Sequence, residues 1–90
     1  MPRYLVERTF PDGFALPKSK EGAETCMVIV DNNAEDGVTW VHSYVTADKK
    51  KLFCIYDAPS PEAIRSAAAR NHMPVDRIVQ ISVLDPYFYE

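Results

Sequence analysis

Two short segments, residues 38–45 and 52–57, carry the side chains of this chain that are best suited to chemistry. At alternate positions they hold an indole, an imidazole, a thiol and two phenols. These residues are Trp40, His42, Tyr44, Cys54 and Tyr56. Because successive side chains of a β-strand point to opposite faces, the alternation predicts that all five share one face of a sheet.

Metal binding is one chemistry that this face predicts. Alternation over residues 4–10 adds Glu7 to the same face. An imidazole, a carboxylate and a thiolate together suit nickel, copper, zinc or iron, so His42, Glu7 and Cys54 are the predicted ligands. Their spacing is no local metal motif, which leaves open that His42 is only hydrogen-bonded to a tyrosine or carboxylate inside an interface. His72 is expected at the surface after a helix, where a metal contact is also open.

Acid–base catalysis is the second chemistry. An imidazole beside a buried carboxylate can move protons near neutral pH, so His42 is the predicted acid or base of an enzyme. Cys54 is a candidate nucleophile if His42 activates it. Trp40, Tyr44 and Tyr56 would line a pocket for a small planar or apolar ligand. The same aromatic lining suits a packed interface equally well.

The elements that must position these groups follow from periodicity and turn signals. Strands are predicted at 4–10, 39–46, 52–56 and 75–84, and helices at 18–35 and from 61 to about 71. Ser60-Pro61-Glu62 is a typical helix start, with a hydroxyl cap, a proline at the first position and a carboxylate in the first turn. The inward stripe of the first helix is predicted to be Ala23, Cys26, Met27, Val30 and Ala34. Cys26 is therefore expected to be a buried, inert thiol.

Strand pairing decides which side chains share a face. We expect Val45 opposite Phe53, because this register keeps one face of the hairpin apolar. Its further pairs are Ser43 with Ile55, Tyr44 with Cys54 and His42 with Tyr56. The alternative, with Tyr44 opposite Phe53, mixes apolar and polar groups on both faces.

The element order β-α-β-β-α-β predicts a ferredoxin-like α+β fold, a four-stranded antiparallel sheet with both helices on one face. The other face would stay open. Its predicted residues are Leu5, Glu7, Trp40, His42, Tyr44, Cys54, Tyr56, Ile78 and Leu84. Such a face is too apolar to remain in water, so we expect a homodimer that packs sheet against sheet as a dimeric α/β barrel.

Length and composition set limits on function. Residues 1–90 are predicted to form a single domain, with an aromatic tail at about 85–90. A net charge of −3 argues against nucleic acid as the main partner. No apolar run approaches the roughly 20 residues that span a bilayer, so no membrane partner is expected. The N-terminus lacks the features of a signal peptide, which favours a cytoplasmic location.

Several segments resemble a bacterial family of small, dimeric, ferredoxin-like proteins of unknown function that includes a nickel-binding protein. They are residues 4–10, 37–44, 53–56, 61–65, 74–78 and 84–88. The resemblance covers nearly the whole chain and implies nickel as the metal. It does not assign the ligands.

The leading hypothesis is therefore a transition-metal protein, with nickel implied by the resemblance and no other cofactor expected. The metal would lie on the open sheet face at the dimer interface, held by His42, Glu7 and Cys54, with Tyr44 and Tyr56 around them. The alternative is a small cofactor-independent dimeric-barrel enzyme, an oxygenase or isomerase, acting on a small organic substrate. A purely structural dimer without a ligand is the third possibility. The sequence identifies neither the substrate nor the pathway.

Overall fold

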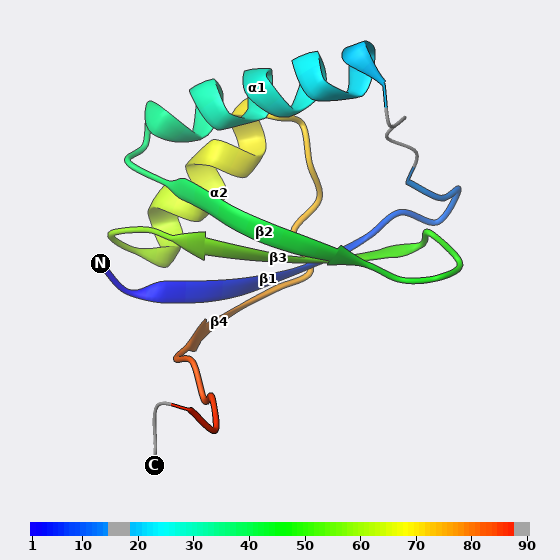
Figure 1. Cartoon of the computed structure of the whole chain (residues 1–90). Coiled ribbons are helices and arrows are strands. Elements are labelled where there is room, and N and C mark those ends of the chain that lie inside the picture. The colour runs from blue at the N-terminus through cyan, green and yellow to red at the C-terminus, as the bar shows by residue number, and fades with distance from the viewer. Residues whose placement is uncertain (15–18, 88–90) are drawn as a thin grey trace.

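The computed structural model describes residues 1–14 and 19–87. The elements in chain order are β1 (Arg3–Thr9), α1 (Lys20–Ala34), β2 (Thr39–Val45), β3 (Lys51–Asp57), α2 (Pro61–Arg70) and β4 (Arg77–Ile81). The four strands form one sheet in the order β2-β3-β1-β4, and every pair is antiparallel. Both helices cover the same face (Figure 1). The predicted ferredoxin-like fold is confirmed.

Helix α2 begins where the sequence predicted. The Ser60 hydroxyl accepts a hydrogen bond from the Ala63 amide at 3.2 Å, and Pro61 occupies the first helical position. The side chain of Ile64 is fully buried, and the small side chains of Ala67 and Ala68 are buried with it. Ile64 and Ala67 belong to the same buried cluster as the inward residues of β1 and β3, so α2 closes the core over the sheet.

Helix α1 presents a different face to the protein from the one predicted. Gly22 and Asn33 are buried, and Cys26 and Ile29 are half-buried. The other four residues of the predicted inward stripe are exposed, namely Ala23, Met27, Val30 and Ala34. The prediction followed hydrophobicity, whereas the inward stripe includes a glycine and an asparagine. Cys26 is a free, partly buried thiol rather than a fully buried one. The predicted start at Lys18 lies outside the described residues, and Ser19 is the N-cap of α1.

The pairing of β2 with β3 differs from the prediction by one residue. Tyr44 lies opposite Phe53, and Ser43 lies opposite Cys54, which is the register that sequence analysis disfavoured. This register holds from the turn as far as His42, and between His42 and Trp40 one extra residue bulges out of the ladder. Beyond a bulge, alternation restarts with the opposite phase. Trp40 therefore points toward the helices, while His42 and Tyr44 point to the open face.

The central strands show which face is buried. Directly opposite residues of an antiparallel pair project to the same side of the sheet. Cys54 lies opposite Val6, and Tyr56 lies opposite Tyr4, and all four side chains are buried on the helix side. The prediction that Cys54 and Tyr56 lie on the open face is therefore wrong. Strand β3 is apolar on both sides, so hydrophobicity alone did not distinguish its faces.

Strand β4 also has its faces reversed relative to the prediction. Ile78 lies opposite Val6 and so points toward the helices, while Val79 lies opposite Leu5 on the open face. Leu84 lies beyond the end of β4 and is exposed. Figure 1 shows the chain after β4 leaving the sheet on the side away from the helices. Phe88 and Tyr89 of the predicted aromatic tail lie outside the described residues. No helix in the described part of the chain is long and apolar enough to span a membrane.

Candidate functional site

The open sheet face is mainly apolar in its centre. It is defined here as the side away from the helices, with its residues assigned by strand pairing: Leu5, Glu7, His42, Tyr44, Phe53, Ile55, Arg77, Val79 and Ile81. Ile55 is only 7% exposed, and its apolar neighbours on β1, β3 and β4 are half-buried. Two ion pairs, Arg3 with Asp57 and Lys51 with Glu7, lie at two margins of this apolar centre. A face of this kind is typical of a surface that another body covers.

His42 supplies the exposed imidazole of the open face. It lies on the edge strand β2, opposite Ile55. Its ring meets the ring of Tyr44 edge-on, with centroids 5.1 Å apart and planes at 84°. Tyr44 is itself 62% exposed. The imidazole is therefore held beside a phenol and is accessible to a ligand.

Glu7 lies on the same face but is already paired. Its Oε1 atom accepts a hydrogen bond from Nζ of Lys51 at 2.6 Å, and this contact raises the pKa of Lys51. Strand β3 separates β1 from β2, and Glu7 pairs with Phe53 whereas His42 pairs with Ile55, which places the backbones of Glu7 and His42 roughly 12 Å apart. Glu7 could approach a ligand near His42 only by giving up its ion pair.

Cys54 does not join the other two predicted ligands. It is 2% exposed, and it lies under the helices between Val6 and Ser43 on the neighbouring strands. His42 and Glu7 project from the opposite side of the sheet. The structure thus brings two of the three residues to one face and places the third in the core.

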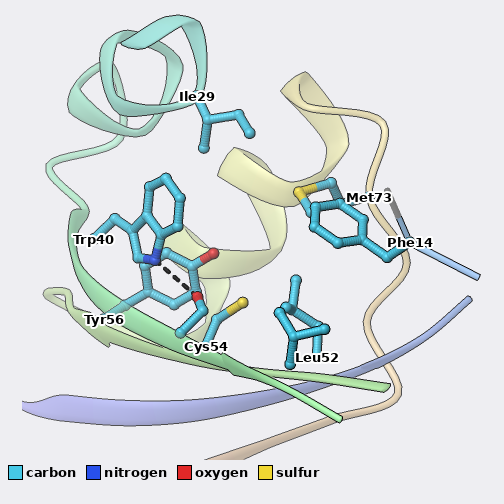
Figure 2. Close-up of a pocket in the computed structure, with 9 residues that line it drawn as sticks. Phe14, Ile29, Trp40, Leu52, Cys54, Tyr56 and Met73 are labelled. Atoms are coloured by element: carbon cyan, nitrogen blue, oxygen red, sulfur yellow. Dashed lines mark hydrogen bonds between the residues drawn. The ribbon is translucent and has the colours of Figure 1, made fainter. Parts of the chain in front are cut away.

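The helix side of the sheet holds a cavity of about 190 Å³ that is partly open to solvent. Its lining residues on the strands include Trp40, Ser43, Leu52, Cys54 and Tyr56, and Ile29 of α1 faces them. Figure 2 shows Trp40 and Tyr56 at one end and Phe14 and Met73 at the other. Trp40 and Tyr56 line this cavity on the helix side rather than a pocket on the open face, where they were predicted, and Tyr44 does not line it.

Ser43 has a structural role that sequence analysis missed. The indole Nε1 of Trp40 donates a hydrogen bond to its Oγ at 2.8 Å, which fixes the indole against the cavity (Figure 2). The two residues are three apart, and strict alternation would place them on opposite faces. The bulge brings both to the helix side. No feature of the sequence marks that bulge.

Arg8 is the second residue that sequence analysis missed. It is 2% exposed and follows Tyr4 and Val6 on the buried face of β1. Its NH1 donates to the Pro74 carbonyl at 2.6 Å, and its NH2 donates to the Tyr56 hydroxyl at 3.2 Å. Its Nε is buried and has no hydrogen-bond partner among the described residues. Alternation along β1 places Arg8 on the same side as Tyr4 and Val6. This alternation is the feature of the sequence from which the burial of Arg8 could have been predicted.

The environment of Tyr56 keeps its phenol protonated. Burial is the main cause that raises the pKa of Tyr56 to about 12, and the neighbouring Cys54 acts in the same direction. Arg8 works the other way, because a cation favours the phenolate. The hydroxyl is therefore a neutral donor and acceptor at the wall of the cavity.

Comparison with known proteins places the chain in a family. A family model described as "Nickel responsive protein SCO4226-like" matches residues 4–81. The chain belongs to this SCO4226-like family. The crystal structure of SCO4226 from Streptomyces coelicolor A3(2) is similar, with a TM-score of 0.71 and 13% sequence identity. The match covers 92% of this chain and 99% of that one, and at this identity it supports the fold alone. No curated protein matches the sequence.

The family name raises the question of whether these side chains fit nickel. Nickel accepts imidazole, carboxylate and thiolate ligands, and His42 offers an accessible imidazole. Within residues 1–14 and 19–87, however, no three histidine, cysteine, aspartate or glutamate side chains lie together as a metal group. One copy of the described chain therefore does not provide a complete set of protein ligands.

Proposed function

We propose that this protein binds a transition metal, nickel by preference, between two copies that pack through their open faces. His42 of each copy would be the main ligand. The observation that carries the proposal is the position of His42, an exposed imidazole at the border of an apolar sheet face. Membership in a nickel-responsive family supports the choice of metal.

A second copy is needed on physical grounds. The described residues of a single chain offer His42 without enough neighbouring donors, and two-fold symmetry would double the donors at the interface. The half-buried Val79 and Phe53 belong to the surface that the second copy would cover. The exposed residues Leu84 and Tyr87 follow β4 in the chain, and they are candidates to extend the contact. Glu7 is the next candidate ligand, at the expense of its ion pair with Lys51.

Two of the sequence-based alternatives have less support. Cys54 is omitted from the proposed ligands because it lies in the core, on the far side of the sheet. The dimeric-barrel enzyme required Trp40 and Tyr56 to line a pocket beside His42. Both residues line a cavity on the helix side instead.

The test is nickel binding by tag-free protein purified without chelators or metal columns. Elemental mass spectrometry would give the metal content, and calorimetric titration with Ni²⁺ would give the affinity. We expect His42→Ala to weaken binding by about tenfold or more, since a lost imidazole ligand has no substitute. His72→Ala removes the other histidine, which is also exposed, and should bind like wild type. Equal binding by both variants would refute the assignment to His42.

The role of the second copy is tested separately. Val79→Lys places a charge in the open face without touching His42, and sedimentation velocity would report the oligomeric state. We expect this variant to be monomeric and to lose nickel uptake. Cys54→Ser should retain uptake, because its side chain is on the other face. A monomeric wild-type protein that takes up nickel would show that one chain is sufficient.

A further inference from the structure

The cavity between the sheet and α1 has the size and lining of a small-molecule site. Its volume of about 190 Å³ exceeds the roughly 150 Å³ in which a benzene ring is known to bind an apolar cavity. Leu52 and Ile29 give it apolar walls, and Trp40 forms one end (Figure 2). A single-ring molecule matches this space. No part of the proposed nickel function uses it.

A buried positive charge lies behind the cavity wall. Arginine is almost never fully buried unless it is paired, because an isolated charge is costly in an apolar interior. Arg8 is 2% exposed, and no carboxylate of the described residues forms an ion pair with it. Its Nε also has no hydrogen-bond partner in residues 1–14 and 19–87. Within the described part of the chain, the groups that balance the charge are the Pro74 carbonyl, the Tyr56 hydroxyl and the Tyr56 ring, whose centroid is 5.9 Å away.

Tyr56 connects this charge with the cavity. Its side chain lines the cavity, and its hydroxyl oxygen accepts the hydrogen bond from Arg8. A phenol that accepts one hydrogen bond still has its own hydrogen to donate. Beside it, the Cys54 thiol is only a weak acceptor. An anionic oxygen would be a stronger acceptor, and it would also offset the charge of Arg8.

We propose that this cavity binds a small carboxylate with an apolar, single-ring body. The Tyr56 hydroxyl donates to the carboxylate, and Arg8 supplies the balancing charge through that hydroxyl. The ring lies between Trp40 and the side chain of Ile29. This site is independent of the open face, since the two lie on opposite sides of the sheet.

The single tryptophan of the chain makes the proposal directly measurable. Trp40 lines the cavity, so its fluorescence, excited at 295 nm, reports on occupancy. Benzoate is the anionic probe and toluene is the neutral probe of similar size. Titrations are made in EDTA, so the result does not depend on metal binding. We expect the fluorescence of Trp40 to change saturably with benzoate. Toluene should bind at least about tenfold more weakly than benzoate.

Variants separate the parts of the site. Tyr56→Phe removes only the hydroxyl and should weaken benzoate binding by about tenfold while leaving toluene binding nearly unchanged. Arg8→Met removes the charge and should have the same selective effect. Ile29→Phe fills the cavity and should abolish binding of both probes. Tyr44→Phe, a phenol on the open face, is the matched control and should bind like wild type.

Three outcomes overturn the proposal. No fluorescence response to either probe would show that the cavity takes no ligand. Toluene binding as tightly as benzoate would show that the site has no preference for a carboxylate. Benzoate binding that survives in Ile29→Phe would place the ligand elsewhere. If Arg8→Met fails to fold, Tyr56→Phe still decides the role of the polar pair.

Discussion

The guanidinium of Arg8 donates a hydrogen bond to the hydroxyl of Tyr56 at 3.2 Å, across two neighbouring strands in the core. The pair lies on the helix side of the sheet, away from the proposed nickel site. Its polar atoms are packed among apolar side chains, which makes the ionisation of Tyr56 unfavourable. The protein thus has a buried polar centre next to its cavity, in addition to its open face.

Ionisation of Tyr56 should limit stability at high pH. Its folded-state pKa of about 12 lies above the ordinary value of 10.0, so its contribution to stability is complete below pH 10 and is lost as the pH rises toward 12. Absorbance at 295 nm should show one late phenolate transition, which is missing in Tyr56→Phe. Tyr44→Phe, which removes an exposed phenol, should keep it. A wild-type titration without a late transition would contradict the burial of this phenol.

The ion pair of Arg3 with Asp57 should limit stability at low pH. Two hydrogen bonds of 2.7 and 3.1 Å join the side chains, and they lower the pKa of Asp57. Because the pKa of Asp57 is lower in the folded than in the unfolded protein, the ion pair stabilises the fold above the unfolded-state pKa, which is near 4. This stabilisation is lost as the pH falls through the folded-state pKa of Asp57. Urea midpoints at pH 6 and pH 3 should therefore differ more for wild type than for Asp57→Asn. Asp12→Asn, at an exposed turn, should behave like wild type.

Lys49 adopts a left-handed backbone conformation, with φ of 65°, in the turn between β2 and β3. A side chain costs about 1 kcal/mol in this region, and glycine avoids that cost. Lys49→Gly should therefore stabilise the protein by roughly 0.5–1 kcal/mol, measured by urea unfolding. Lys50→Gly, one residue later, should be neutral or destabilising because it only adds freedom to the unfolded chain. If the two changes have the same effect, the turn does not have this conformation.

The sequence was sufficient to predict the fold because the relevant signals are local. Ser60 and Pro61 mark the start of a helix, and the face of β1 that holds Tyr4 and Val6 is on the whole more apolar than the other, so both elements and the faces of β1 were predicted. The element order then specified the ferredoxin-like arrangement.

The candidate site was harder to predict because it depends on which face each strand buries. Alternation is informative only where one face is clearly polar, and β3 is apolar on both. The pairing was chosen to keep Phe53 and Ile55 in the core, whereas Cys54 and Tyr56 are the residues under the helices. A bulge then reversed the phase of β2, and no residue type announces a bulge.

The bulge at Val41 lets Trp40 and His42 point to opposite faces although they are two residues apart, and deletion variants can test this. Val41 is the extra residue, since Trp40 lies opposite Tyr56 and His42 lies opposite the next residue, Ile55. Without Val41, Trp40 and His42 become adjacent and still point to opposite faces. We expect this deletion to keep the fold, the Trp40 fluorescence maximum and nickel uptake, at a stability cost of about 1–2 kcal/mol.

Deletion of Ser43 is the matched comparison. It makes His42 and Tyr44 adjacent, so one of them must turn away from the open face, and it removes the acceptor for the Trp40 indole. Urea unfolding should show a larger loss of stability, on the order of 3 kcal/mol, because a polar ring must then enter the helix side or Trp40 must leave it. Nickel uptake should fall as well. Equal losses for the two deletions would mean that Val41 is an ordinary ladder residue, and His42 would then share the face of Trp40.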